Sequence, residues 1–313
     1  MMMTKPAFPA AALSTTVPRH LSARRQNYWD WRAAGNFIGG GTGGSLLFFT
    51  AWVAQGSGAF IALALIALAV MAVGLTCVWL EIGRPWRALN VFRHSTSWMT
   101  REAAVATLLF AVTLPILFFA NAALFWISGL LGLLFVYSQA RILTADKGIP
   151  AWRHPRCVPL MLSTGLCEGA GLLALLAPWL APAAGNWLPP LLTGLIVARV
   201  LLWREYLDGL RQAGIPRGAL DVLQALDRPF VVVGHAVPVA LLLVSWLDAA
   251  AALRPLLTAL AGFCALTAGW AIKYNLVRRA SWNQGFALPH QPVRGRKTAT
   301  MAPTAGRNDA ASL

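Results

Sequence analysis

Charged side chains are scarce in this sequence, and acidic ones most of all. Only 12% of the 313 residues are charged, about half of the share that soluble domains carry. The 26 Lys and Arg outnumber the 11 Asp and Glu, which gives a net charge of +15. A hydrophobic share of 58% and a mean hydropathy of +0.60 exclude both an ordinary soluble enzyme and a disordered chain. The composition is typical of an all-α protein that crosses a lipid bilayer several times.

Cysteine and histidine are also few. The chain has four cysteines, and no two of them form a Cys-x-x-Cys pair. An iron–sulfur cluster needs about four close thiolates, so we expect none in this chain, and no disulfide framework can be argued. His235 is the only histidine inside an apolar segment, so no pair of histidines is placed to hold a haem. The sequence therefore predicts no metal site.

Eight apolar segments are long enough to cross a hydrocarbon core about 30 Å thick, which takes about 20 helical residues. One uncharged run, residues 103–140, is long enough for two helices and is divided near Asn121. The other predicted spans are residues 31–54, 59–82, 158–180, 187–204, 229–247 and 253–275. We expect a flexible tail over residues 1–27, the membrane domain over 28–277, and a basic flexible tail over 278–313. The first tail shows no secretory signal.

The basic residues gather in every second connection between these segments. Three connections are long and rich in arginine, and four are short and nearly uncharged. With eight spans, the arginine-rich connections and both tails fall on one side, and Arg254 is the only basic residue on the other. The positive-inside rule predicts a bacterial inner-membrane protein with both termini in the cytoplasm. Because membrane orientation accounts for the charge, no nucleic-acid partner is expected.

The first span is rich in glycine. Six glycines lie between Gly35 and Gly44, but no strand precedes them and no Gly-Lys-Ser/Thr follows, so a phosphate-binding loop is excluded. Small residues that let helices pack closely are the better interpretation. Pro115, Pro178 and Pro238 fall inside spans and predict kinks or gaps in the hydrogen-bond ladder.

Two carboxylates, Glu81 and Glu102, are expected at the cytoplasmic edge of the membrane, with Arg84 and Arg101 beside them. A side chain that ionises near the hydrocarbon is costly and calls for a reason. Such a carboxylate can act as a proton carrier, and quinone chemistry requires one, because it moves two electrons and two protons. The alternative is that both glutamates only form ion pairs that hold the loop in place.

Three further side chains are candidates for contact with a quinone. Trp86 and Trp98 lie in the same loop, where they either anchor the chain at the membrane interface or border a quinone pocket. His235 is expected one to two turns from the cytoplasmic end of the seventh span. It is either a hydrogen-bonded packing residue or a ligand.

Two charges are expected in the membrane interior. Glu168 lies in the middle of the fifth span, with Arg199 in the sixth as its expected ion partner. The pair is either structural or a step in a proton path. Lys273, near the end of the last span, is expected to extend to the interface.

Four stretches carry a resemblance to a known family and to one of its branches. Leu80–Asn90 (LEIGRPWRALN) and Ser97–Glu102 (SWMTRE) resemble the loop after the second helix of DMSO-reductase membrane anchors. They are also similar to the wider polysulfide-reductase (NrfD-like) anchors. Trp29–Ile38 (WDWRAAGNFI) and Ala280–Pro289 (ASWNQGFALP) resemble the anchor branch associated with phenylacetyl-CoA:acceptor oxidoreductase.

The resemblance implies a fold and a role. The fold is two packed four-helix bundles. The role is that of a membrane anchor, without a metal of its own, which exchanges electrons with menaquinone or ubiquinone. It implies two partners, a ferredoxin-like iron–sulfur subunit and a molybdopterin catalytic subunit. The quinol site of the family uses a histidine at the position of Glu81 and a glutamate at that of Glu102, so Glu102 matches and Glu81 departs.

The predicted orientation indicates on which side of the membrane the partners bind. Since the loop lies on the predicted cytoplasmic face, the partners would dock inside the cell, where the basic loops suit an acidic iron–sulfur subunit. A different interpretation is a transporter whose path is lined by Glu168, Arg199 and His235, although no clear inverted repeat supports it. The third is a passive membrane scaffold.

Overall fold

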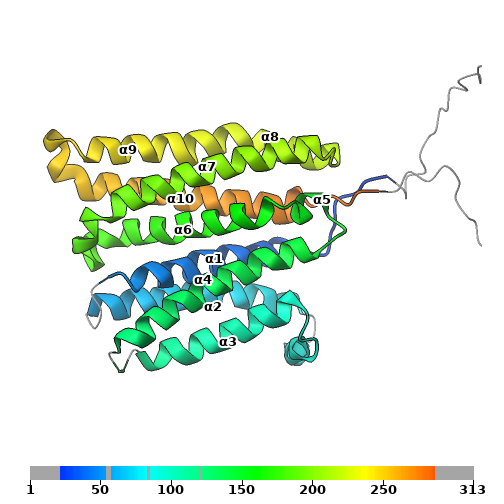
Figure 1. The fold of residues 1–313 in the computed structure, drawn as a ribbon, viewed down its shortest axis with the longest axis horizontal. Coiled ribbons are helices and arrows are strands. Elements are labelled where there is room, and N and C mark those ends of the chain that lie inside the picture. Colours follow the sequence, from blue (N-terminus) through cyan, green and yellow to red (C-terminus); the bar gives the residue numbers. More distant parts are fainter. Residues whose placement is uncertain (1–21, 54–57, 83–84, 117, 120, 286–313) are drawn as a thin grey trace, which may run out of the picture. The chain divides into compact units, whose positions relative to one another are not determined.

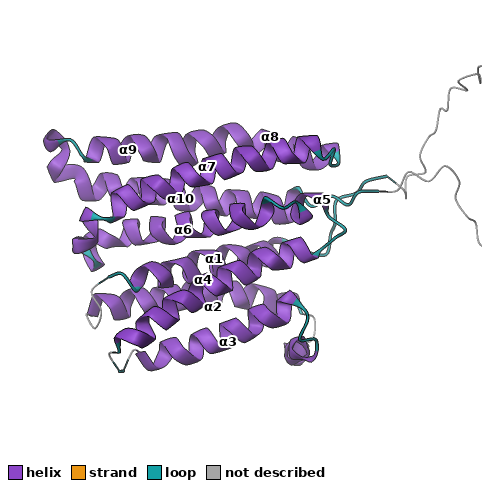
Figure 2. Ribbon diagram, in the orientation of Figure 1, coloured by secondary structure: helices purple, strands orange, loops and turns teal. Residues whose placement is uncertain are grey.

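The computed structural model describes residues 22–53, 58–82, 85–116, 118–119 and 121–285. Residues 23–284 form one compact unit, in which long helices run side by side (Figure 1). Figure 2 shows helices joined by short loops, and no strand in the part of the chain described. The protein is all-α, as its composition predicts.

The helices follow the predicted apolar segments. The long ones are α1 (Trp31–Thr50), α2 (Gly58–Glu81), α3 (Trp98–Ile116), α4 (Ala122–Ala145), α6 (Cys157–Leu180), α7 (Leu188–Gln212) and α10 (Arg254–Tyr274). A further long helix consists of α8 (Arg217–Val231), the π-helical segment η3 (Val232–Ala236) and α9 (Val237–Ser245). The short elements are η1 (Pro85–Arg93), α5 (Pro150–Arg153), η2 (Pro182–Asn186), η4 (Asp248–Leu253) and η5 (Asn275–Arg279).

Within the described ranges, six helical segments are long and apolar enough to cross a membrane. They are α2, α3, α4, α6, the helix from α8 to α9, and the segment that contains α10. The two remaining long helices are less apolar, because α1 carries its glycines and α7 carries Arg199, Arg204 and Glu205. The protein is thus an integral membrane protein with six candidate spanning helices.

Helix ends follow local chemistry and not only hydropathy. The predicted division at Asn121 is confirmed: its side chain accepts hydrogen bonds from the backbone N–H groups of Ala123 and Leu124 and caps α4. Asp30 caps α1 in the same way, and its hydrogen bond with Arg32 holds the pKa of this carboxyl below its ordinary value. By contrast, α7 runs on past Arg204 and α8 begins well before Pro229, because a helix continues beyond the apolar stretch that hydropathy detects.

Helix α1 lies at the centre of the packing, against α2, α4, α6 and α10. Its glycines make this possible, as the sequence predicts. A Cβ on Gly39 would lie 2.8 Å from the Cα of Gly74 in α2, and one on Gly44 would lie 2.8 Å from the carbonyl oxygen of Gly132 in α4. The helices therefore approach until their backbones touch, which only small residues permit.

This packing gives a prediction. Gly39→Ala is expected to destabilise the protein by about 1–3 kcal/mol, because the new methyl group meets the backbone of α2, which cannot yield. Gly194→Ala in α7 is the matched control, since a Cβ there meets nothing within 4 Å. Thermal unfolding of both variants in detergent checks this. Equal melting temperatures for the two would contradict it.

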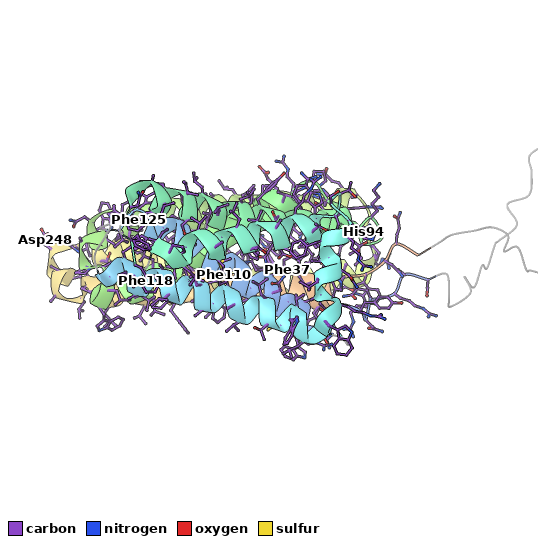
Figure 3. The ribbon with its side chains drawn as sticks, turned by 90° about the horizontal axis from the view of Figure 1, so that it is seen from below. Phe37, His94, Phe110, Phe118, Phe125 and Asp248 are labelled. Carbon is purple, nitrogen blue, oxygen red and sulfur yellow. The ribbon has the colours of Figure 1, made fainter. Side chains whose placement is uncertain are left out.

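The buried apolar residues form two clusters, which lie one after the other along the length of the helices. One cluster contains Phe37 and the other contains Phe125. Figure 3 shows Phe37 toward the end of the bundle marked by His94, and Phe125 toward the end marked by Asp248. Beside the positions where each helix passes from one cluster to the other lie five buried polar side chains: Thr42, Gln139, Thr164, Glu168 and Arg199. The interior of the bundle thus holds polar groups between its two apolar clusters.

Candidate functional site

Glu102 is the fifth residue of α3, just past its first turn, and is buried in the bundle, where it is only 8% exposed. Its Oε1 accepts a hydrogen bond from the Asn36 Nδ2 of α1, over 3.2 Å. The Gln139 Nε2 of α4 donates in turn to the backbone carbonyl of Asn36, over 2.9 Å. Three helices therefore hold this carboxyl group in place.

A small cavity of ≈ 50 Å³ opens beside this group. Glu81 and Glu102 both line it, so the structure brings the two predicted carboxylates to one site. The cavity is lined by Trp29, Ala33, Asn36, Phe37, Val78, Glu81, Met99, Glu102 and Ile142. The Oδ1 of the buried Asn36 has no hydrogen-bond partner among the described residues. The site therefore offers a carboxyl group and a free acceptor to a ligand that carries a hydroxyl.

Two arginines, Arg84 and Arg101, were predicted beside these glutamates. Arg84 lies outside the described residues. The guanidinium of Arg101 stacks on the Trp98 ring at 4.5 Å, and that of Arg141 lies 4.6 Å from the same ring. In the described part of the chain neither glutamate forms an ion pair. The alternative that they only hold the loop in place stays a hypothesis, since Arg84 is not among the described residues.

The two candidate tryptophans do not line the cavity. Trp86 is 74% exposed in η1. Trp98 is half-buried and has the two guanidinium groups on its ring.

Two polar residues near Glu102, Asn36 and Gln139, are not among the site residues predicted from the sequence. The sequence does contain a feature that could have identified them. Both are uncharged polar residues within apolar segments, where an amide without a hydrogen-bond partner is costly.

The ion partner of Glu168 is Lys273 of α10. The prediction that Arg199 is its partner is wrong. The Lys273 Nζ lies 2.6 Å from the Glu168 Oε2, and both side chains are at most 1% exposed. The same ammonium donates to the Phe37 carbonyl oxygen over 2.9 Å, and the Thr42 hydroxyl donates to the Glu168 Oε2 over 3.0 Å. The prediction that Lys273 extends to the interface is therefore also wrong, because its carboxylate partner lies in the interior.

The glycines of α1 and α10 leave the space that this ion pair occupies. A Cβ on Gly41 would collide with the Lys273 ammonium, and one on Gly269 would lie 2.6 Å from the Glu168 Oε1. That Oε1 has no hydrogen-bond partner in the described part of the chain. Part of the glycine pattern thus serves a buried charge pair and not only the contact between helices.

Arg199 pairs with His235 in a second buried network. Its Nε lies 3.2 Å from the His235 Nε2, and its two terminal nitrogens donate to the carbonyl oxygens of Ala265 and Gly234 over 2.8 and 2.7 Å. The His235 Nδ1 lies 2.9 Å from the Phe230 carbonyl oxygen. These contacts fit one neutral tautomer, with the proton on Nδ1 and the lone pair of Nε2 facing Arg199.

The backbone around Pro238 explains this network. Proline lacks an N–H group and its ring displaces the carbonyl four residues earlier, which is that of Gly234. The segment before it is π-helical (η3), so the gap predicted from Pro238 is confirmed, and Arg199 takes up the released carbonyl oxygen. His235 lies about five turns from the start of α8, because this helix begins well before Pro229. Its predicted depth of one to two turns from the cytoplasmic end of the span stays a prediction.

Near the ends of the chain, residues 24–26 pair with residues 281–283. An antiparallel bridge joins Arg25 to Trp282, and the Gln26 Nε2 donates to the Ser281 Oγ over 3.1 Å. Most of both predicted tails lies outside the described residues.

No group of three His, Cys, Asp or Glu able to hold a metal occurs in the part of the chain that is described.

These features define a class: a polytopic helical membrane protein with a buried ion pair and a buried arginine–histidine network in its described interior, and a carboxylate cavity at the end of the bundle that carries the predicted loop. The family model for the DMSO reductase anchor subunit (DmsC) matches residues 33–268, which is 236 of the 313 residues. The chain belongs to the DMSO reductase anchor family. No curated protein matches it. The match does not test the resemblance to the phenylacetyl-CoA branch, which stays a prediction.

Proposed function

We propose that this chain is the quinone-reactive membrane anchor of a multi-subunit oxidoreductase. Family membership makes it an anchor subunit of a DMSO reductase-type complex, which implies a catalytic and an iron–sulfur subunit as partners. The proposal adds that the catalytic partner holds a molybdopterin, that the iron–sulfur partner is ferredoxin-like, and that electrons pass between it and menaquinone or ubiquinone. The observation that carries the proposal is the cavity shared by Glu81, Glu102 and Asn36.

The residues of the cavity suit the hydroxyl groups of a hydroquinone head group. Oxidation of a hydroquinone releases two electrons and two protons. In this proposal Glu102 takes up or returns one proton, and the unpartnered Asn36 Oδ1 accepts the hydrogen bond of that hydroxyl until its proton passes to Glu102. Glu81, in place of the family's histidine, supplies a second carboxyl group for the other proton.

Access to the cavity requires movement of one flexible side chain. The volume of ≈ 50 Å³ is too small for a ring of six carbons with its oxygens. Met99 lines the cavity and is 46% exposed, so it lies on the outer side. A methionine has three rotatable bonds and adapts to irregular spaces, and we propose that it turns aside when a head group enters from the lipid.

The arrangement in the membrane is part of the same proposal. The chain crosses a bacterial inner membrane eight times, as two four-helix bundles, α1–α4 and α6–α10, with both termini in the cytoplasm. Support comes from the lengths of α1 (20 residues) and α7 (25 residues), which fall within the 19 to 32 residues of the six candidate spans, and from the arginine-rich connections at one end. The iron–sulfur subunit would dock on that basic end.

The proton path first suggested for Glu168 and Arg199 becomes a proposal about Glu168 and Lys273. Glu168 faces an ammonium group and has one free oxygen, so a proton could be exchanged there while the second network stays in place. The transporter alternative gains no support, because Glu168, Arg199 and His235 line none of the cavities beside Arg254, His154 or Glu102.

Co-purification tests this function. A C-terminal tag and gentle solubilisation of native membranes are expected to recover a stable complex with an iron–sulfur subunit and a molybdenum-containing subunit. The same complex is expected to exchange electrons with a soluble quinone analogue. A chain that purifies alone, and transports a solute in proteoliposomes, would contradict the proposal.

A further inference from the structure

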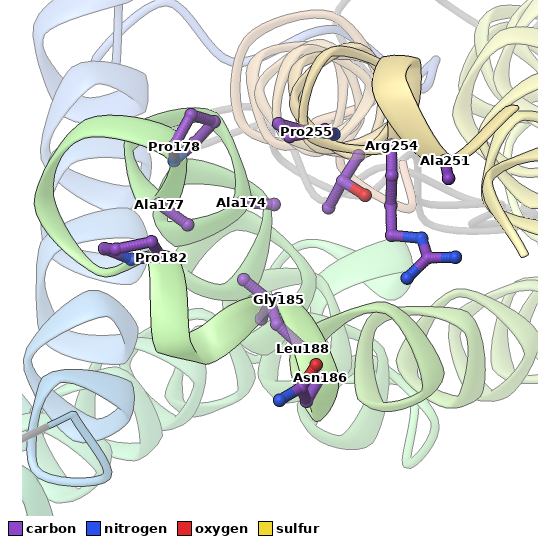
Figure 4. A pocket seen from close by; sticks show the side chains of 11 residues that line it. Ala174, Ala177, Pro178, Pro182, Gly185, Asn186, Leu188, Ala251, Arg254 and Pro255 are labelled. Atoms are coloured by element: carbon purple, nitrogen blue, oxygen red, sulfur yellow. The ribbon is translucent and has the colours of Figure 1, made fainter.

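A larger cavity lies at the opposite end of the bundle, between the end of α6, the η2 segment and the start of α10. Its volume is ≈ 250 Å³. Figure 4 shows Ala174, Ala177 and Pro178 on one side and Arg254 on the other, with Asn186 below. A second cavity of ≈ 210 Å³ shares Gly185, Asn186 and Arg254 with the first and is bounded by Trp246. The two cavities therefore meet around Arg254.

Two polar groups of this site, the terminal nitrogens of Arg254 and the Thr258 hydroxyl, have no hydrogen-bond partner in the part of the chain that is described. The Arg254 Nε donates to the Ser245 carbonyl oxygen over 2.9 Å, but its two terminal nitrogens form no hydrogen bond and no ion pair there. Thr258 follows one helical turn later on the same face of α10. It is 6% exposed, lines the cavity, and its hydroxyl has no hydrogen bond with any described residue. The Asn186 amide lines the cavity from the η2 side.

The electrostatics of the site favour an anion. The short connections at this end of the bundle contain no basic residue in the sequence, and Arg254 directly follows one of them as the first residue of α10. Its planar guanidinium suits two oxygens of one phosphate. The first turn of α10 begins at the same residue, and no side chain caps it. The positive end of the helix dipole therefore adds to the charge of the guanidinium.

The position of the site favours an amphipathic anion. Tryptophans gather at this end, where Trp52 contacts both Trp126 and Trp187, and Trp179 and Trp246 are 74% and 61% exposed. Such residues mark the level of lipid headgroups. The rest of the cavity wall is apolar, formed by alanines, prolines and Leu188, and this suits a hydrocarbon chain.

We propose that this cavity binds one anionic phospholipid. The phosphate lies against Arg254 and the Thr258 hydroxyl, the glycerol ester region faces Asn186, and an acyl chain follows the apolar wall. The proposal is independent of the quinone site, which lies at the other end of the bundle. The proposal assigns a function to Arg254, the one basic residue that the sequence places on the side opposite the arginine-rich connections.

Native mass spectrometry of the full chain in detergent tests the proposal. Delipidated protein is titrated with dioleoyl phosphatidylglycerol, with dioleoyl phosphatidylcholine and with inorganic phosphate. We expect one phosphatidylglycerol per chain and at least tenfold weaker binding by Arg254→Gln. Thr258→Val, which keeps the side-chain shape, is expected to bind several-fold more weakly. Arg211→Gln, at the opposite end of α7, is the control and is expected to bind as the unmodified chain does.

Each other outcome would overturn the proposal. Equal binding of phosphatidylcholine would show that the charge does not select the lipid. Release of phosphatidylglycerol by inorganic phosphate would assign the cavity to a free anion. Unchanged binding in both Arg254→Gln and Thr258→Val would move the lipid elsewhere. Because Thr258→Val removes only a hydroxyl, a folding defect in the arginine variant does not prevent the test.

Discussion

Replacing Lys273 with Met is expected to reduce the stability of the protein by about 3–5 kcal/mol, because it leaves the Glu168 carboxylate buried without its counter-charge. Glu168→Met is expected to cost a similar amount. The double variant is expected to recover most of the loss, since two unbranched apolar side chains of similar length then fill the same space. Unfolding of the four proteins in detergent gives the coupling energy directly.

An exposed ion pair provides the control for this cycle. Arg156 and Glu205 lie 3.0 Å apart, and both side chains are more than half exposed. Glu205→Gln is expected to cost less than about 1 kcal/mol. If the double variant were as unstable as the sum of the two single variants, the buried pair would not be the cause, and the substituted side chains themselves would disturb the packing.

The same variants separate stability from proton movement. If Glu168 serves the proton path proposed above, the double variant will fold and assemble but lose proton exchange in the interior. A passive structural pair predicts a folded double variant with unchanged quinone turnover. The comparison is informative because the double variant removes both charges without leaving either one uncompensated.

Glu102→Gln is expected to lower the quinone turnover of the complex by about 100-fold or more, because general acid–base groups contribute about 10²–10⁴-fold. Glutamine keeps the shape of the side chain and a carbonyl oxygen for the Asn36 Nδ2, but it cannot take up or release a proton at physiological pH. Assembly with the partner subunits is therefore expected to be retained. Turnover is measured with a soluble quinone analogue, in whichever direction the complex runs.

Asp248→Asn is the control for this variant. Asp248 is exposed and lies at the other end of the bundle from His94 (Figure 3), so its replacement is expected to leave turnover unchanged. Glu102→Gln with full turnover in an assembled complex would remove Glu102 from the mechanism. Loss of assembly in this variant alone would show that the carboxyl group has a structural role.

Much of the fold follows from patterns that are local in the sequence. Long apolar segments predict helices wherever they occur, and Asn121 divides one of these segments because its side chain can cap a helix. The glycines of α1 predict a helix that others approach closely, and the structure confirms this. The loop that carries Glu81 and Glu102 indicates the family, which the match to residues 33–268 confirms. Each of these inferences depends only on neighbours in the chain.

The partners of the buried charges could not be predicted in this way. Glu168 and Lys273 are separated by 105 positions, and which cation meets the carboxylate depends on how α6 and α10 are rotated and shifted beside α1. Arg199 was the more obvious candidate, since it lies on the next helix along the chain. The break in the helix at Pro238 instead releases a carbonyl oxygen for Arg199, and His235 is carried to it.

The sequence by itself therefore determined that this protein is an all-helical membrane anchor with an uneven distribution of charge, because hydropathy and local motifs act over a few residues. Only the tertiary structure decided that Asn36 lies beside Glu102, that Lys273 is buried with Glu168, and that Arg254 faces a cavity. The physical reason is that a side chain in a membrane helix is matched with its partner by the angle and register of helix packing. These arise from the contacts of the whole bundle and leave no periodic signal in the chain.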